Sequence, residues 1–464
     1  MIPMTLPEIA EVVGGEVHDD SGVTVTGPAF LDSRAVEADG LFVALPGENV
    51  DGHDFAAGAV EAGAAAVLAQ RPVGVPAVVV PDVAQALPAL ARHVVGALDR
   101  TRVVGLTGSQ GKTGTKDLLA QVLATAGPTV ATHGSFNNEL GMPLTVLRAT
   151  ADTEFLVLEM GARGIGHIRD LCAIAQPDVA LVLNVGKAHV GEFGSQEAIA
   201  QAKGELVESL AADGVAVLNA DDPLVAAMAS RTQARVSTFG EAAAADVRVE
   251  GLHLDDAGRP VFALVTSEGS ADVRLQLLGE HQASNAAAAA GVALALGLGL
   301  HQVAAALSSA TNASRWRMET HLRPDGVLVV NDAYNANPDS MRAALKTLAS
   351  LGRGRGGART IAVLGEMREL GESSRDEHDA VGRLAVRLDI AQLLVVGEGA
   401  RAIHLGACLE GSWAEESVFV PDVDAATAWL REHVRPGDVV LVKASRAAAL
   451  ERVAAALLEE DNVR

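Results

Sequence analysis

Residues Thr107–Thr113, Thr-Gly-Ser-Gln-Gly-Lys-Thr, form the stretch that decides the fold. The apolar run Val103–Leu106 comes before it, and Thr113–Ala126 has the pattern of a helix. Glycines in such a turn let backbone N–H groups approach phosphate oxygens, and the first helical turn adds the positive end of its dipole. We therefore predict a phosphate-binding loop in which Lys112 reaches the β- and γ-phosphates of ATP and the Thr113 hydroxyl binds Mg²⁺.

A glycine-rich turn that merely starts a helix is the alternative for this loop. Leu106 stands where the broad form of the motif has Gly or Ala. The order Gly, Lys, Thr between a strand and a helix nevertheless favours the phosphate loop. The residues predicted to bind ATP here are Thr107, Gly108, Ser109, Gln110, Gly111, Lys112 and Thr113.

Short apolar runs alternate with helical segments on both sides of this loop. Strands expected at Phe155–Leu158, Val179–Leu183 and Val215–Leu218 are separated by helices, which predicts a parallel sheet with right-handed crossovers. Three strand-like runs between residues 247 and 278 follow without helices and predict a small antiparallel addition. A second alternation over residues 327–442 predicts a doubly wound, Rossmann-like domain.

The fold class predicted from these patterns is α/β with three domains. A chain of 464 residues is too long for one ordinary core. We predict a small N-terminal domain over residues 1–99, a central parallel-sheet ATPase domain over 100–314, and a C-terminal Rossmann-like domain over 315–464. The composition, 49% hydrophobic and 20% charged, is that of a compact globular protein.

The charge balance excludes some classes of partner. The chain has 59 acidic and 36 basic residues, a net charge of −23, so we expect no binding to nucleic acid or anionic membranes. Its two cysteines cannot build a disulfide framework. The start lacks a signal-peptide pattern and no long apolar run occurs, which predicts a cytoplasmic protein without membrane insertion.

Further along the chain, two polar side chains follow strands at the edge where the phosphate loop is expected. Glu159 ends the run Phe155–Gly161, and a carboxylate there is well placed to bind Mg²⁺, although an ordinary strand-end carboxylate is the alternative. His189 lies in Asn184–Ser195 after another strand, where a lone histidine is more often structural. On a helix, Lys203 would ordinarily be a solvated surface charge.

The short form Gly-x-x-Gly-Lys-Thr, together with these segments in this order, resembles the Mur ligase and folylpolyglutamate synthetase superfamily. The resemblance implies an ATP-dependent ligase that forms a C–N bond, with two Mg²⁺ ions and a carbamylated Lys203. The catalytic residues that it implies are Lys112, Glu159, His189 and Lys203. The metal ligands that it implies are Thr113, Glu159, His189 and the carbamate on Lys203.

The resemblance also implies roles for residues outside the loop. Asn138 matches a loop near the phosphates and the nucleotide-linked sugar, and Asn285 matches a helix that contacts adenine. Residues 31–54 resemble the uridine-nucleotide domain of the family. Asp32, Ser33 and Arg34 are the residues of that domain predicted to bind substrate.

The segment Asp332–Met341 indicates the substrates. It resembles the branch of the family that adds D-alanyl-D-alanine to UDP-N-acetylmuramoyl-tripeptide through an acyl phosphate. Arg317 and Asp332 are then expected to contact ATP from the C-terminal domain. Candidates for the incoming dipeptide are Tyr334, Asn335, Asn337, Lys443 and Ser445, although Asn-Ala-Asn-Pro is also a good helix start.

Three rival interpretations remain open from the sequence. The chain could catalyse the preceding amino-acid-adding step, or be a folylpolyglutamate synthetase, but residues 31–54 argue against the folate enzyme, which lacks a uridine-binding module. It could also be a phosphate-loop switch protein that hydrolyses ATP slowly. We predict a monomer whose C-terminal domain closes on ATP, because water must be excluded from an acyl phosphate.

Overall fold

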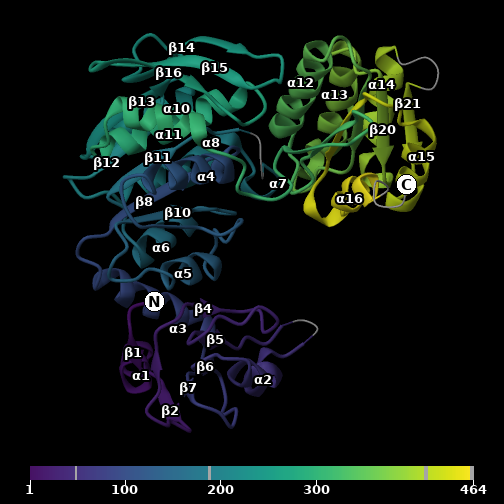
Figure 1. Cartoon of the computed structure of the whole chain (residues 1–464). Helices are drawn as coiled ribbons and strands as arrows, with labels where there is room; N and C mark the ends of the chain where they lie inside the picture. The colour runs from purple at the N-terminus through teal and green to yellow at the C-terminus, as the bar shows by residue number, and fades with distance from the viewer. Residues whose placement is uncertain (48–49, 187–189, 412–415, 460–464) are drawn as a thin grey trace.

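The computed structural model describes residues 1–47, 50–186, 190–411 and 416–459. Three large β-sheets with flanking helices build these segments, and the predicted α/β class is confirmed. In Figure 1 the N-terminal sheet (purple to dark blue) lies at the bottom, the central sheet above it, and the C-terminal sheet at the upper right. No helix within the described segments is long and apolar enough to cross a membrane.

The N-terminal part contains a five-stranded sheet in the order β2-β7-β6-β5-β4. Strands β4 to β7 run parallel, and β2 pairs antiparallel with β7. Its elements are β1 (Met4–Thr5), α1 (Leu6–Val13), β2 (Glu16–His18), β3 (Thr24–Val25), β4 (Ala29–Phe30), β5 (Leu41–Val43), η1 (Gly52–Phe55), α2 (Ala56–Glu61), β6 (Ala66–Ala69), β7 (Ala77–Val79) and α3 (Val83–Gly96).

The central part contains a nine-stranded sheet in the order β16-β15-β14-β13-β12-β11-β8-β10-β9. The elements as far as the third helical crossover are β8 (Arg102–Thr107), α4 (Lys112–Leu123), β9 (Thr129–Ala131), α5 (Gly141–Val146), β10 (Phe155–Glu159), α6 (His167–Ile174), β11 (Val179–Val182), α7 (Val190–Phe193) and α8 (Gln196–Glu208). Those that follow are β12 (Val215–Asn219), α9 (Pro223–Ala226), η2 (Ala227–Arg231), β13 (Arg235–Gly240), β14 (Val247–Leu254), β15 (Pro260–Thr266), β16 (Gly269–Arg274), α10 (His281–Ala295) and α11 (Leu300–Ser309).

Pairing in this sheet follows the sequence pattern. Neighbouring strands from β9 to β14 are parallel, as the alternation with helices predicted. Strands β14, β15 and β16 are antiparallel to one another, which confirms the predicted addition. Every residue of β10 and β12 is buried, because helices cover both faces of the parallel region.

The C-terminal part contains a six-stranded sheet in the order β17-β18-β22-β19-β20-β21, in which only β17 is antiparallel to its neighbour. Its elements are β17 (Glu319–Leu322), β18 (Leu328–Asn331), α12 (Pro338–Gly354), β19 (Thr360–Leu364), η3 (Gly371–Ser373), α13 (Ser374–Arg387), β20 (Gln392–Val396), η4 (Glu398–Ala400), α14 (Arg401–Glu410), β21 (Ser417–Val420), α15 (Val423–His433), β22 (Val439–Lys443), η5 (Arg446–Ala448) and α16 (Glu451–Glu459).

Helix α12 is longer than its sequence pattern indicates. The sequence pattern of a helix covers Met341–Leu351, but the helix begins at Pro338 and ends at Gly354. The side chain of Asn337 accepts a hydrogen bond from the backbone N–H of Ser340 and thereby caps the first turn. At the other end, a Cβ atom on Gly352 would lie 2.6 Å from Cγ2 of Thr360 in strand β19. Glycine at this position therefore lets the last turn of the helix pack against the sheet.

Packing contacts join the central part to both of its neighbours. Leu87 on α3 and Leu144 on α5 belong to one buried apolar core, so the N-terminal part is packed onto the central part. The guanidinium of Arg92 also donates to the backbone oxygen of Ala173, 2.8 Å away. On the other side, Leu278 of the central part is buried within a core of the C-terminal part.

Candidate active site

The phosphate loop connects β8 to α4, as predicted. Gly111 has a φ of +79°, a left-handed conformation that favours glycine. A Cβ atom at this position would lie 2.6 Å from Oδ1 of Asn285, and one at Gly108 would lie 2.8 Å from Cβ of Leu183. Close packing therefore favours glycine at both positions, and the turn conformation favours it at Gly111 as well.

Asn184 holds the loop from the neighbouring strand. Its Oδ1 accepts hydrogen bonds from the backbone N–H groups of Ser109 and Gln110, each 3.0 Å away. Its Nδ2 donates to the backbone oxygen of Gln110 at 3.2 Å. Sequence reasoning did not select Asn184, although a polar residue just beyond the carboxyl end of β11 was a usable signal.

The Lys112 side chain bends back over the loop. Its Nζ donates to the backbone oxygen of Gly108 at 2.7 Å. Burial lowers the pKa of Lys112, Glu159 opposes this shift, and Arg317 adds to it. Within the described residues, the ammonium donates to one neutral oxygen at the loop, which a phosphate could replace.

Thr113, Glu159 and Asn137 form a connected polar cluster beside the loop. The Thr113 hydroxyl donates to one carboxylate oxygen of Glu159 at 3.0 Å, and Nδ2 of Asn137 donates to the other at 2.7 Å. Glu159 is buried and its backbone N–H donates to the hydroxyl of Thr132. A buried carboxylate with oriented oxygens next to a phosphate loop can ligate a hard cation.

Asn138, for which the resemblance implied a place near the phosphates, has different hydrogen-bond partners from the adjacent Asn137. Its Oδ1 accepts a hydrogen bond from the backbone N–H of Gly141, at the start of helix α5. The residue beside Glu159 is Asn137 instead. Sequence reasoning missed Asn137, because two consecutive asparagines point to different neighbours only once the loop is folded.

Lys203 is buried on helix α8, not solvated on its surface. Burial lowers the pKa of Lys203 well below its ordinary value, and the nearby Lys112 lowers it further. No carboxylate among the described residues opposes this shift. His189, the other predicted metal ligand, lies outside the described residues.

Arg231 holds the outer side of helix α8 next to Lys203. Its guanidinium donates to the backbone oxygens of Ala200 and Gln201, at 3.1 and 2.9 Å, and forms an ion pair with Glu208. The guanidinium lies where a side chain at position 204 would be, since a Cβ on Gly204 would be only 1.8 Å from Nη1. Gly204 therefore makes room for the guanidinium of Arg231. We call this guanidinium, with its bonds to Ala200, Gln201 and Glu208, the Arg231 clamp.

The central helix α10 contributes Asn285 beside the loop. Its Nδ2 donates to the side-chain oxygen of Gln282 at 2.9 Å, while its Oδ1 faces Gly111. The alanines that follow are completely buried against the sheet. Asn285 is therefore placed at the phosphate loop by the close approach of this alanine-rich face.

The C-terminal part brings Arg317 and Asp332 to the same edge. Nη2 of Arg317 donates to the Thr113 hydroxyl at 3.3 Å, and its guanidinium stacks 4.2 Å above the centre of the Tyr334 ring. Asp332 accepts a hydrogen bond from Nζ of Lys443 at 2.6 Å. Burial lowers the pKa of Lys443, and Asp332 opposes this shift.

The remaining predicted dipeptide residues surround this pair. Lys443 also donates to the backbone oxygen of Asn335 at 2.9 Å. The Ser445 hydroxyl accepts from the backbone N–H of Arg368 at 3.0 Å. Asn337 uses its side-chain oxygen to cap α12, the alternative role that the motif Asn-Pro allowed.

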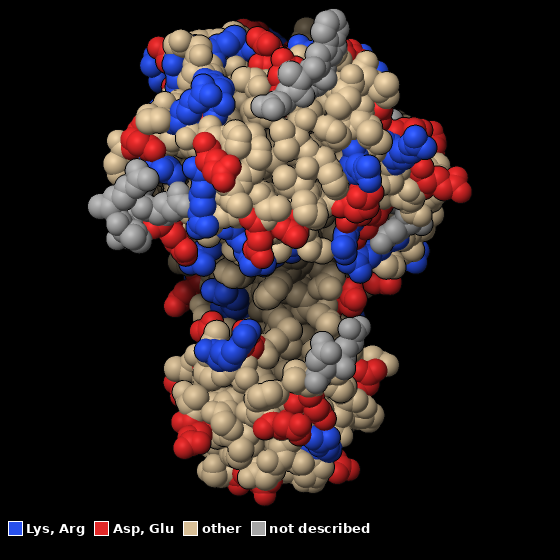
Figure 2. All heavy atoms as spheres, turned by 90° about the vertical axis from the view of Figure 1, so that its right-hand side faces the viewer, with Lys and Arg blue, Asp and Glu red and all other residues tan. Residues whose placement is uncertain are grey.

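Asp32, Ser33 and Arg34 lie on the N-terminal part, away from the loop. Arg34 donates through Nε and Nη2 to the two carboxylate oxygens of Asp32, both at 2.8 Å, and this pair lowers the pKa of Asp32 to about 2. Both side chains are exposed. Figure 2 shows a hollow between the N-terminal part at the bottom and the rest of the molecule, a shape that could receive an elongated substrate.

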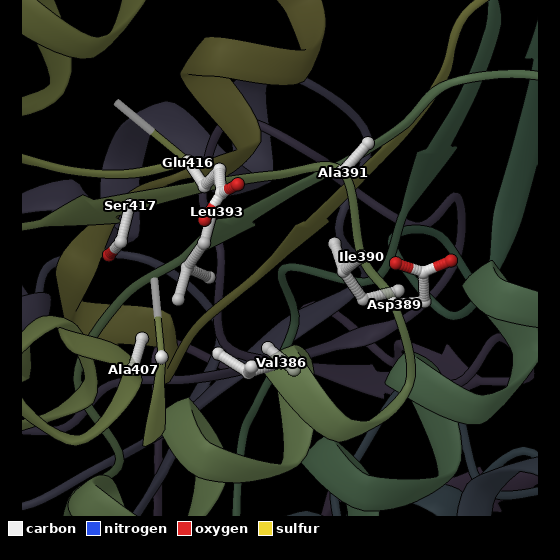
Figure 3. Close-up of a pocket in the computed structure, with 10 residues that line it drawn as sticks. Val386, Asp389, Ile390, Ala391, Leu393, Ala407, Glu416 and Ser417 are labelled. Carbon is white, nitrogen blue, oxygen red and sulfur yellow. The ribbon is translucent and has the colours of Figure 1, made fainter. Parts of the chain in front are cut away.

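Two cavities lie apart from these residues. Val386, Asp389, Leu393 and Ser417 help to line one of about 230 Å³ inside the C-terminal part (Figure 3). Another, of about 460 Å³, lies between the β14–β15 turn and the C-terminal part. No predicted site residue lines either cavity.

Comparisons with known proteins agree with this geometry. Family models match the Mur ligase family, catalytic domain, at residues 30–104, the Mur ligase middle domain at 106–293, and the Mur ligase, glutamate ligase domain, at 316–446. The chain belongs to the Mur ligase family. The match covers all three sheets, so the phosphate loop here is part of an ATP-dependent ligase.

Individual members of the Mur ligase family are similar over their whole lengths. The chain is 51% identical to the UDP-N-acetylmuramoyl-tripeptide--D-alanyl-D-alanine ligase of Mycobacterium tuberculosis, with 99% of each chain covered. The crystal structure of MurF from Acinetobacter baumannii superposes with a TM-score of 0.86 at 33% identity, covering 98% of this chain and 99% of that one. MurF from Thermotoga maritima in complex with ADP gives a TM-score of 0.79 at 31% identity, covering 95% and 99%.

Proposed function

We propose that this Mur ligase joins D-alanyl-D-alanine to UDP-N-acetylmuramoyl-tripeptide, with conversion of ATP to ADP and phosphate. The observation that carries the proposal is the 51% identity, over 99% of both chains, to a relative named for that reaction. The segment Asp332–Met341 supports it, because the ring of Tyr334 lies under Arg317, whose guanidinium donates to Thr113 of the phosphate loop. The product would be the pentapeptide precursor of peptidoglycan.

The first step transfers the γ-phosphoryl group of ATP to the terminal carboxylate of the tripeptide. A carboxylate oxygen forms the new bond to phosphorus while the bond to ADP breaks. Lys112 and Arg317 oppose the negative charge of the transferring group, and the N–H groups at the start of α4 add to this effect. In the second step the amine of D-alanyl-D-alanine attacks the acyl phosphate, releases phosphate and loses a proton.

The residues beside the loop fit a Mg²⁺ site. Thr113 and Glu159 present a hydroxyl and a carboxylate in contact, and Asn137 orients the carboxylate. No group of three or more His, Cys, Asp or Glu side chains suited to a metal lies within the described segments, as expected where substrate phosphates supply further oxygens. Bound Mg²⁺ neutralises charge on those phosphates. We propose that His189 is a further ligand.

Lys203 completes the proposed site as a carbamate. Carbon dioxide reacts with a neutral amine, and burial favours this form because it lowers the pKa of Lys203. The reaction forms an N–C bond and releases a proton, so it converts the amine into an anion that can face metal ions. Its position one residue from Gly204, under the Arg231 clamp, keeps the carbamate on a fixed helix.

The two substrates would approach from the outer parts. We propose that Asp32, Ser33 and Arg34 contact the uridine nucleotide, because the side chains of Asp32 and Arg34 are exposed on the N-terminal part. Tyr334, Asn335, Asn337, Lys443 and Ser445 would surround the dipeptide. Asn138 would lie near the phosphates, Asn285 near adenine, and Asp332 near ribose. The monomeric state and cytoplasmic location stay predictions.

A coupled assay of phosphate release tests the proposal. We expect release that requires both UDP-N-acetylmuramoyl-tripeptide and D-alanyl-D-alanine, and that is lost in Lys112→Met. Replacement of the dipeptide by a single amino acid, with UDP-N-acetylmuramoyl-dipeptide as acceptor, tests the preceding step; tetrahydrofolate with glutamate tests the folate reaction. Rapid ATP turnover without any acceptor would instead support a switch protein and overturn the proposal.

A further inference from the structure

The side chain of Tyr334 connects two segments that the reaction needs but that belong to different parts of the chain. Its hydroxyl is hydrogen-bonded to the hydroxyl of Ser135, on the loop between β9 and α5 of the central part. Its ring lies under the guanidinium of Arg317, 4.2 Å from the ring centre. The Ser135 contact joins the C-terminal part to the central part, and the ring contact, within the C-terminal part, supports the guanidinium that reaches Thr113 of the phosphate loop.

Each contact leads to a group of the proposed site. Arg317 donates to Thr113, and the loop that carries Ser135 also carries Asn137, which donates to Glu159. Thr113 and Glu159 are themselves hydrogen-bonded. Tyr334 thus closes a ring of contacts from the loop of the central part, through the phosphate loop, to Arg317 and back.

The backbone around Arg317 needs such support. Trp316 and Met318, on either side of it, have φ values of +57° and +51°, a left-handed conformation that is unfavourable for large side chains. The backbone N–H of Tyr334 donates to the backbone oxygen of Trp316 at 3.2 Å. The Arg317 Nε is buried without a hydrogen-bond partner among the described residues, so the ring beneath it is a major contact that orients the guanidinium.

We propose that Tyr334 is a positioning residue, which sets Arg317 and the Ser135–Asn137 loop for phosphoryl transfer when the central and C-terminal parts are together. This inference rests on the proposed function and adds a positioning role to the expected place of Tyr334 beside the dipeptide. Its hydroxyl couples the two parts, and its ring orients Arg317. The nearby Ser135 has the matching role on the central part.

Kinetics of the intact chain test the coupling. We expect Tyr334→Phe and Ser135→Ala each to lower kcat about fivefold with little change in the KM for the UDP-linked acceptor, because each removes the same hydrogen bond. The double variant should lose no more than either single one. Tyr334→Leu, which also removes the stacked ring, should lower kcat further. Additive losses, or a change in KM alone, would overturn the proposal.

A spectroscopic test does not depend on the identity of the substrates. The chain has a single tyrosine, so incorporation of 3-fluorotyrosine gives one ¹⁹F resonance, from position 334. We expect Ser135→Ala to shift this resonance, and Ser230→Ala, which removes an exposed hydroxyl bonded only to a backbone oxygen, to leave it unchanged. An identical resonance in both variants overturns the contact. A shifted resonance with no acceptor-dependent phosphate release leaves the contact intact and rejects the proposed function instead.

Discussion

Two buried lysines lie at this active site, one on helix α8 and one at the end of strand β22, and they differ in what surrounds them. Lys443 forms an ion pair with Asp332 at 2.6 Å and also donates to a backbone oxygen. Lys203 is also buried, but no carboxylate among the described residues raises its pKa. Burial lowers the pKa of both, and only Lys443 has a carboxylate that opposes the shift.

The different surroundings give the two amines different charge states and different reactivity. A buried ammonium beside a carboxylate stays charged and holds its partner in place. A buried amine without an anion is driven toward its neutral form, which is the form that reacts as a nucleophile. Lys443 therefore acts as a fixed cation that orients Asp332, and Lys203 is suited to the covalent change proposed above.

Removal of the Lys443 charge should have the largest effect. Lys443→Met leaves Asp332 as a buried carboxylate without its partner, so the free energy of unfolding should fall by about 3–5 kcal/mol. Urea titration measures this quantity. The double variant with Asp332→Leu should recover part of the loss, because neither charge then remains; a double variant as unstable as Lys443→Met would contradict the ion-pair role.

The same change at Lys203 should affect activity and not folding. Lys203→Met should lower acceptor-dependent phosphate release by about 10²–10³-fold, since an anion that positions Mg²⁺ is lost. Its free energy of unfolding should be equal to or higher than that of the unchanged chain, because an unpaired buried amine is replaced by an apolar side chain. Lys346→Met, at an exposed position on α12, is the control. Near-normal turnover in Lys203→Met would refute the assignment.

The Arg231 clamp should be sensitive to one methyl group. Gly204→Ala places a Cβ where the guanidinium of Arg231 lies, so either the arginine or helix α8 must move. We expect the free energy of unfolding to fall by about 1–3 kcal/mol. Activity should fall as well, because Lys203 is the adjacent residue on the helix. Gly58→Ala, at a glycine of helix α2 with open space around it, is the control for an added methyl group on a helix.

The smallest effect is expected in the pH dependence of the free energy of unfolding, which reports the lowered pKa of Lys203. Because the folded pKa of Lys203 lies below its ordinary value of 10.5, the unfolded chain binds more protons between these two values. The contribution of Lys203 to the free energy of unfolding therefore rises with pH across this window, by at most about 1.4 kcal/mol per pH unit. Urea titrations in buffer free of carbon dioxide should show this rise and its loss in Lys203→Met. An unchanged slope would indicate an unburied lysine.

Much of the active-site edge could be predicted from local sequence. Gly111 and Lys112 are recognised by their spacing, because the loop and its helix are formed by consecutive residues. Glu159 ends a strand in the sequence, and carboxyl ends of parallel strands share one edge. The parallel order of the central sheet and its antiparallel extension follow from whether helices separate the strands.

Contacts between distant segments could not be predicted in this way. Asn184 accepts a hydrogen bond from the phosphate loop, and Asn137 donates one to Glu159. Both contacts depend on loop conformations that no sequence pattern predicts. The burial of Lys203 depends on how α8 packs, since a helical lysine is ordinarily exposed. Tyr334 meets Ser135 only because two sheets, each with its own core, are brought side by side.

By itself, the sequence determined the α/β class, the phosphate loop and the family, because these depend on periodicity and on motifs of neighbouring residues. The tertiary structure alone decided which lysine has a carboxylate partner, which of two adjacent asparagines faces Glu159, and which side chain joins the two ATP-binding parts. The physical reason is that pKa, ion pairing and orientation are set by groups far away along the chain. Burial then strengthens the electrostatic interaction with each of those groups, because water no longer screens it.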